Sequence, residues 1–276
     1  MLLGVDFDKA RPATDVTDAA TDATSDADKA PGPPRFCETL SPAPWLCADF
    51  EGDDLREGWG LPGLTADLTD TAGAKSERVA LDPDSPPELG RHAARFTAPA
   101  LLTRDKLATA SLWKQLPHLA DLAINFKMRI VSEQFEQGGR VELFELSSGD
   151  EFGTPSRRVE GTLLMTRTVG GLTQVDIFRG KLGGPWLTHD ELDPWPVNAW
   201  RNVQVVMSPR TGAGDAGKNE MIVRLDNEIQ SRRQLDSELF ASFPLFFQIG
   251  IVAVTGRSDI FRVEVDNVRI DLTPAK

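Results

Sequence analysis

The stretch from residue 183 to 200, GGPWLTHDELDPWPVNAW, gathers the side chains best suited to binding a ligand. Its prolines and glycines are typical of a loop, and the candidate residues within it are Trp186, His189, Asp190 and Trp195. Sugar recognition uses such a mixture, because an aromatic ring covers the C–H patch of a sugar while carboxylate and imidazole groups hydrogen-bond its hydroxyls. The alternative is that both Trp side chains anchor a long loop on the protein body. Trp200 continues into a strand, and we expect it in the core.

Catalytic patterns are weak by comparison. Glu142 and Glu145 are the nearest approach to a pair of catalytic acids, but three positions along a regular strand place them on opposite faces, where they cannot flank one glycosidic bond. The glycine-rich run GAGDAGK at 212–218 needs a following helix to bind a nucleotide, and the residues that follow alternate like a strand. The residues favour binding over catalysis and leave enzymatic activity open.

The charge balance narrows the classes of partner. The chain has 276 residues, with 42 acidic side chains against 30 Lys and Arg, and a formal net charge of -12. Nucleic acid and anionic lipid surfaces require clustered cations, so neither is an expected partner. No stretch approaches the roughly 18 uninterrupted apolar residues of a transmembrane span, so none is expected.

Alternation of apolar and polar residues indicates the elements that must position these side chains. It is clearest in 121–130, where Leu122, Ile124, Phe126, Met128 and Ile130 share one face. Weaker strands are expected at 64–69, 76–81, 91–97, 110–116, 140–147, 159–169, 172–179 and 245–254, with a helix as the alternative for 101–116. The parity of the last strand shifts after Val265, which predicts a bulge near Asp266 and Asn267. Many short strands with turns between them predict an all-β sandwich or barrel.

Residues 1–35 are predicted to form a disordered tether, because Asp, Thr, Ala and Pro offer too little apolar area to offset the entropy of ordering. Residues 36–276 are predicted to form one domain. The opening MLLGVDFDKA lacks the basic start and apolar run of a signal peptide. It resembles the start of a mature bacterial lipoprotein, which implies a lipid anchor upstream of Met1 and an extracytoplasmic location, at the cell surface or in the periplasm. The genomic region before Met1 tests this, since an anchor requires an in-frame basic, apolar and Cys-containing segment there.

Two cysteines, Cys37 and Cys47, bracket a loop that contains prolines. A disulfide between them fits an exported protein, whereas two buried free thiols fit a cytosolic one. We favour the disulfide, in agreement with the composition of the tether.

Several segments, taken in order, resemble the concanavalin A-like lectin/glucanase fold, a group that includes laminin G-like modules of exported bacterial proteins. FCETLSPAPWLCADFEGDDLREGW resembles a common start of such modules. AWRNVQVVMS and NEMIVRLDNEIQ resemble a strand pair of the fold, with a turn at Asp226 and Asn227. FQIGIVAVTG and FRVEVDNVRID resemble its closing strands. The resemblance spans residues 36 to 272 and implies an antiparallel two-sheet jelly-roll sandwich.

The resemblance implies several functions, since the fold carries lectins, glycoside hydrolases and passive modules alike. The glucanase motif Glu-x-Asp-x-x-Glu is absent. We therefore expect a non-catalytic module that binds a glycan or another cell-surface component. The alternatives are a glycoside hydrolase or lyase with non-standard acids, and a structural spacer without a ligand.

Such jelly rolls often hold a structural calcium ion through acids near the first and last strands, which correspond here to Asp49, Glu51 and Asp266. The alternative for these acids is hydrogen bonding within the protein or plain exposure.

Overall fold

The computed structural model describes residues 35–55, 67–70, 73–102, 107–117, 119–132, 139–148, 158–167, 173–181, 186–193, 195–208, 220–234, 245–255 and 258–274. Except for Arg35, the predicted tether lies outside these residues. No helix in the described ranges is long and apolar enough to cross a membrane.

Strands dominate the described part. In chain order they are β1 (Leu46–Ala48), β2 (Asp67–Asp70), β3 (Lys75–Ala80), β4 (His92–Ala98), β5 (Leu107–Leu116), β6 (Leu119–Ser132), β7 (Arg140–Ser148), β8 (Arg158–Arg167), β9 (Thr173–Lys181), β10 (Trp186–Glu191), β11 (Trp200–Ser208), β12 (Glu220–Leu225), β13 (Glu228–Gln234), β14 (Leu245–Thr255) and β15 (Phe261–Pro274). A short helix, α1 (Phe36–Thr39), and a 3₁₀ turn at Pro87–Leu89 complete the order.

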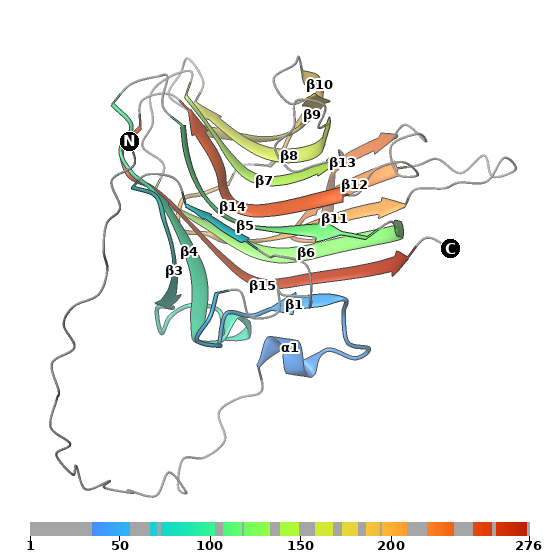
Figure 1. Ribbon diagram of the computed structural model, residues 1–276, viewed down its shortest axis with the longest axis horizontal. Helices are drawn as coiled ribbons and strands as arrows, with labels where there is room; N and C mark the ends of the chain where they lie inside the picture. The colour runs from blue at the N-terminus through green and yellow to red at the C-terminus, as the bar shows by residue number, and fades with distance from the viewer. Residues whose placement is uncertain are drawn as a thin grey trace, which may run out of the picture. The chain divides into compact units, whose positions relative to one another are not determined.

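The strands form two antiparallel sheets. The first, called the β6 sheet, has the order β13-β12-β11-β6-β15-β4-β3, with β1 added beside β15. The second, called the β14 sheet, has the order β10-β9-β8-β7-β14-β5-β2. The two sheets form a sandwich (Figure 1). The predicted all-β, antiparallel two-sheet jelly roll is confirmed.

The core lies between the sheets, where period-two alternation places the apolar side chains. On β6, Ile124, Phe126 and Met128 are fully buried. Phe126 stacks on Phe144 of β7, with ring centroids 5.6 Å apart, and so joins the two sheets. Apolar residues of strands from both sheets make up one hydrophobic cluster.

The predicted bulge near Asp266 and Asn267 is confirmed, and it organises one end of the β6 sheet. The pairing of β15 with β6 shifts register after Asp266, and Asn267 adopts φ 51°. On the other side of β15, Phe261–Val265 pair with β4, whereas Val268–Ile270 pair with β1. The bulge therefore lies where β15 changes partner. This brings the end of β1 and the start of β4 to the same place.

Two local predictions are confirmed as well. The turn at Asp226 and Asn227 has positive φ at both residues, 49° and 74°, which Asp and Asn tolerate better than most residues. Cys37 and Cys47 form a disulfide. The ambiguous segment 101–116 contains a strand, β5, which pairs with both β14 and β2.

The prediction of a loop through residues 183–200 was wrong in part. Its first half contains β10, an edge strand that pairs antiparallel with β9, with a bulge between Trp186 and Thr188. WLTHDE has no clean alternation of apolar and polar residues. Periodicity therefore does not reveal this strand, and pairing with a neighbour forms it.

Candidate functional site

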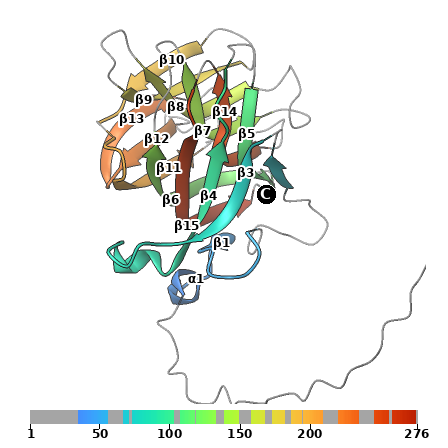
Figure 2. The ribbon, with the colours of Figure 1, turned by 90° about the vertical axis from the view of Figure 1, so that its left-hand side faces the viewer.

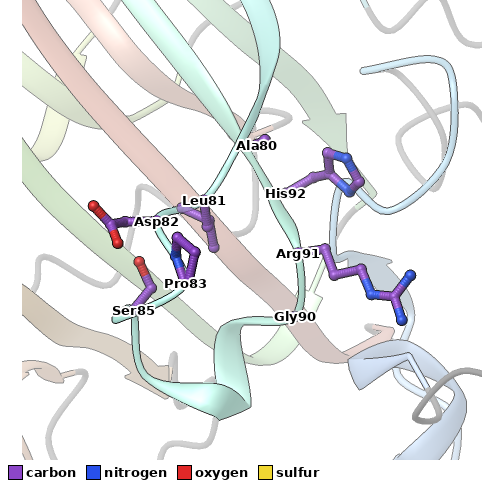
Figure 3. Close-up of a pocket in the computed structure, with 8 residues that line it drawn as sticks. All are labelled: Ala80, Leu81, Asp82, Pro83, Ser85, Gly90, Arg91 and His92. Atoms are coloured by element: carbon purple, nitrogen blue, oxygen red, sulfur yellow. The ribbon is translucent and has the colours of Figure 1, made fainter.

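The segment 81–91, called the β3–β4 loop, shapes the cavities found in the described part. It lies at the same end of the β6 sheet as α1 and β1 (Figure 2). One cavity, of about 530 Å³, opens within the loop and is lined by Ala80, Leu81, Asp82, Pro83, Ser85, Gly90, Arg91 and His92. In Figure 3, Asp82 and Ser85 extend to one side of the loop, and Arg91 and His92 to the other. The loop therefore presents two chemically distinct sides.

A second cavity, called the Trp200 cavity, lies on the Asp82 and Ser85 side. Its volume is about 370 Å³, and its lining residues are Asp82, Asp84, Ser85, Pro86, Arg129, Asn198 and Trp200. The first four belong to the β3–β4 loop, Arg129 to β6, and Asn198 and Trp200 to the turn that enters β11. The backbone N–H of Asn198 donates to the carbonyl of Ile130 over 2.8 Å, which fixes this turn against β6. Three separate parts of the chain thus form one site.

The indole of Trp200 is held by an ion cluster on the outer face of the β6 sheet. Glu264, fully buried, accepts hydrogen bonds from both Arg95 and Arg129, the latter through Nε at 2.9 Å and through Nη2. The Arg129 guanidinium lies over the Trp200 ring, 5.0 Å from its centroid. Arg129 is thereby positioned by Glu264 and in turn positions the indole.

Two polar atoms of residues that line the Trp200 cavity are buried and have no hydrogen-bond partner among the described residues. They are the indole N–H (Nε1) of Trp200 and the hydroxyl (Oγ) of Ser85. Leaving a buried donor or hydroxyl unpaired costs about 1–3 kcal/mol, so such groups normally meet a ligand or water. The residues that line the cavity thus combine an aromatic ring with two polar groups that are buried and unpaired, and a ligand in the cavity reaches these two groups when neighbouring side chains move aside.

The three acids predicted to bind calcium come together at the β15 bulge. Asp49 follows β1, and Asp266 lies in the bulge beside it. Asp49 accepts hydrogen bonds from Arg35 Nη2 at 2.7 Å and from the backbone of Cys37 at 3.2 Å. Burial alone would raise the pKa of Asp49, but these bonds outweigh it and lower the pKa. Asp49 therefore ties α1 to the sheet as a carboxylate.

Glu51 anchors the β3–β4 loop. Its Oε1 accepts the backbone N–H groups of Arg91 at 2.5 Å and His92 at 2.9 Å, and its Oε2 lies 3.0 Å from His92 Nδ1. Burial would raise the pKa of Glu51, but these partners lower it. A Cβ on Gly90, which has φ 76°, would lie 2.4 Å from Glu51 Oε1, so glycine is what allows this close approach.

Asp266 differs from the other two acids. It is fully buried, its Oδ1 accepts the backbone N–H of Asn267 at 2.7 Å, and its Oδ2 has no partner within the described part of the chain. Burial raises the pKa of Asp266 to about 9, and the charges of Glu51 and Asp49 add to the rise. The neighbouring Asn267 donates from Nδ2 to the carbonyl of Glu88, also over 2.7 Å, and its Oδ1 is unpartnered too. Among the described residues, no set of three or more His, Cys, Asp or Glu side chains is placed to hold a metal ion.

The four predicted ligand-binding residues occupy different environments. Asp190 on β10 is half-buried and bound to Ser231 Oγ at 2.5 Å and Arg233 Nε at 2.7 Å, so it ties the edge of the β14 sheet to β13. Trp195 is 6% exposed and belongs to the hydrophobic core cluster. The side chains of Trp186 and His189 lie outside the described part. The ligand-binding role of these four residues stays a prediction.

Trp200, by contrast, was expected in the core, and the structure corrects this. It is half-exposed and lines the cavity. The alternation of β11 contains the missing signal, because Val203, Val205 and Met207 face the core and an even-numbered residue on this strand faces outward. The β3–β4 loop carries no comparable periodicity.

The two glutamates of β7 also require a correction. A bulge between Glu142 and Phe144 shifts the alternation, and with Val141 and Phe144 in the core, Glu142 and Glu145 both face the outer side of the β14 sheet. Figure 1 shows β7, β8 and β14 bending along their length, which makes this side concave. Glu145 is only 2% exposed, however, so its carboxylate is not open to a substrate in this structure.

No protein-family model matches the sequence, and no curated protein matches it significantly. Among solved structures, the fold is similar to endo-beta-1,4-glucuronan lyase from the fungus Trichoderma reesei, with TM-score 0.53 and 13% identity over 77% of this chain and 92% of that chain. It is also similar to the potassium-bound carbohydrate recognition domain of Emp46p, with TM-score 0.52 and 15% identity over 82% of this chain and 95% of that chain. At 13% and 15% identity, these similarities show the jelly-roll sandwich fold and extend no further than the fold.

Proposed function

We propose that this chain is a non-catalytic carbohydrate-binding module and that the Trp200 cavity is its binding site. The observation that carries the proposal is the pair of unpartnered polar atoms, Trp200 Nε1 and Ser85 Oγ, beside an aromatic ring in one cavity. A sugar satisfies both kinds of surface, because its C–H patch covers the ring and its hydroxyls pair with the polar atoms. Asn198 at the cavity supplies an amide that can both donate and accept.

Two further observations support this proposal. The proteins of similar fold include a carbohydrate recognition domain and a glucuronan lyase, so this fold occurs in proteins that bind or cleave carbohydrates. The two carboxylates of the cavity, Asp82 and Asp84, belong to one loop, in which the backbone N–H of Asp84 donates to Asp82 Oδ1 over 3.0 Å. Glycoside hydrolysis requires carboxyl groups on opposite sides of the scissile bond, and neighbours on one turn do not suit that arrangement.

Trp200→Ala is expected to weaken glycan binding at least tenfold, since stacking on one aromatic ring contributes about 0.5–1.5 kcal/mol beyond the area it buries, and the indole hydrogen bond is lost too. The measurement is a glycan array followed by calorimetry with the best ligand. Trp200→Phe, which keeps a ring but loses the N–H, should fall between wild type and Trp200→Ala.

Two tryptophan variants serve as matched controls. Trp113→Ala removes a ring from the outer face of the β14 sheet, and Trp186→Ala removes the ring singled out by the sequence. If binding is lost in either of these variants but kept in Trp200→Ala, the binding site lies at the replaced tryptophan of the β14 sheet, and the proposal is contradicted. Release of hydrolysis or elimination products from the bound oligosaccharide would instead favour the enzymatic alternative.

We also propose that calcium binds at the β15 bulge, through ligands that only partly match the acids predicted from the sequence. Asp49 and Glu51 are already hydrogen-bonded within the protein, whereas Asp266 Oδ2 and Asn267 Oδ1 are buried oxygens without partners. Oxygen ligands of this kind suit Ca²⁺.

Saturating Ca²⁺ is expected to raise the Tm of the wild type by roughly 5 °C, the shift that ligand at about 100 times Kd produces in a domain of this size. An unchanged Tm in millimolar Ca²⁺ would exclude the site, as would an equal rise in Asp266→Asn.

A further inference from the structure

The charge around the Trp200 cavity limits the sugars it accepts. Asp82 and Asp84 are both exposed at its rim, and within the described part neither carboxylate is paired with a cation. Of the described residues that line the cavity, Arg129 is the one cation, and its guanidinium is bound to Glu264 through Nε and Nη2. Glu264 is shared with Arg95, so the three side chains together carry a net charge of +1, which is smaller in magnitude than the combined charge of the two rim carboxylates.

The lining of the cavity therefore carries a net negative charge, and the whole chain has a net charge of -12. An anionic sugar such as a uronate would meet Asp82 and Asp84 as like charges, which disfavours it. A protonated amine on the sugar would meet the same carboxylates as a counter-charge. Asp82 and Ser85 extend to the same side of the loop, so a charged partner and a hydroxyl partner are available next to each other (Figure 3).

We infer that the Trp200 cavity selects an amino sugar with a free amine, in preference to its N-acetylated form and to uronates. This inference rests on the proposed carbohydrate-binding function and adds its substrate class. The sugar ring covers the indole, the hydroxyls pair with Trp200 Nε1 and Ser85 Oγ, and the ammonium group lies between the carboxylates of the β3–β4 loop. This class of sugar differs from glucuronan, the polyuronate that appears in the name of the fungal lyase of similar fold.

The experiment compares three oligosaccharides of equal length with the full chain by calorimetry. They are a glucosamine oligomer, its N-acetylated counterpart and a glucuronate oligomer. The glucosamine oligomer is expected to bind about three- to tenfold tighter than the N-acetylated one at low salt, the effect of one or two exposed ion pairs. Raising the salt concentration should reduce this ratio, because exposed pairs are screened.

The double variant Asp82→Asn/Asp84→Asn is expected to bring the ratio of the two affinities close to one while binding of the N-acetylated oligomer persists. Asp121→Asn, which removes an exposed carboxylate elsewhere on the β6 sheet, should leave the ratio unchanged. Equal affinity for both forms in the wild type, or tighter binding of glucuronate, would overturn the inference while Trp200-dependent binding still supports the module. Absence of any binding that depends on Trp200 would overturn the proposed function itself.

Discussion

Replacing Gly250 by alanine is expected to lower the free energy of unfolding by roughly 3–5 kcal/mol. Gly250 lies on β14, an inner strand between β7 and β5, and has φ 116°, a conformation almost confined to glycine. A Cβ there would lie 2.8 Å from the carbonyl oxygen of Ala110 and 2.8 Å from the ring of Phe96. Phe96 is fully buried in the core and Ala110 O belongs to the backbone, so neither can move without disturbing the packing between the sheets.

Gly73→Ala is the matched control, because it has the cost of a positive φ at alanine without the steric overlap of the new Cβ with its neighbours. Gly73 also has positive φ, 80°, but a Cβ there would make ordinary contact with Pro99 at 3.4 Å. This variant should lose only about 1–2 kcal/mol, the cost of the left-handed backbone alone. Urea unfolding of both variants measures the difference. Equal destabilisation of the two would mean that the core around Phe96 accommodates an extra methyl group, contrary to the expectation.

The strands were predictable because their burial is periodic. Alternation located β6 and the strand of residues 140–147 closely, and its reversal after Val265 located the bulge on β15. The strand at 245–254 was predicted from a run that is apolar on both faces, without alternation. The same rule failed where pairing rather than periodicity defines a strand, as in β10. The assumption of a regular strand also misled at Glu142 and Glu145, where the adjacent apolar residues Leu143 and Phe144 mark a shift of parity at the bulge.

The candidate site was predictable only in fragments. Asp49, Glu51 and Asp266 were singled out through the resemblance, and the change of partner along β15 brings them together. The Trp200 cavity was missed, because it depends on the path of the β3–β4 loop. That path is set by contacts between residues far apart in sequence, Glu51 with His92 and Asn267 with Glu88, and a single sequence does not reveal such contacts.

Replacing Asp266 by asparagine is expected to stabilise the metal-free domain by on the order of 4 kcal/mol at pH 7. The pKa of Asp266 is raised to about 9 in the folded protein, from an ordinary value of 3.8. At pH 7 the unfolded chain carries an ionised carboxylate at this position and the folded chain a protonated one. The wild type must therefore take up a proton on folding, whereas asparagine is neutral in both states.

The dependence on pH follows from the same difference. A raised pKa contributes stability that is complete below about pH 4 and is lost as pH rises towards 9, at about 1.4 kcal/mol per pH unit. Lys127, Glu51 and Asp49 also act on Asp266, and the lowered pKa values of both these acids give them the opposite dependence, with stability lost at low pH. The difference between wild type and Asp266→Asn cancels most of these contributions. That difference should grow steadily from pH 5 to 8.

Chemical denaturation in buffer with a chelator measures this difference, and Asp271→Asn is the matched control. Asp271 lies on the same strand, is partly exposed and is paired with Arg269, so its replacement should change stability by less than about 1 kcal/mol at every pH. A pH-independent difference between wild type and Asp266→Asn would mean that Asp266 is ionised in the folded protein and has a counter-charge. Asn267 lies beside Asp266 and donates to the carbonyl of Glu88. Such a counter-ion would therefore also affect the position of the β3–β4 loop and the shape of the cavity that this loop lines.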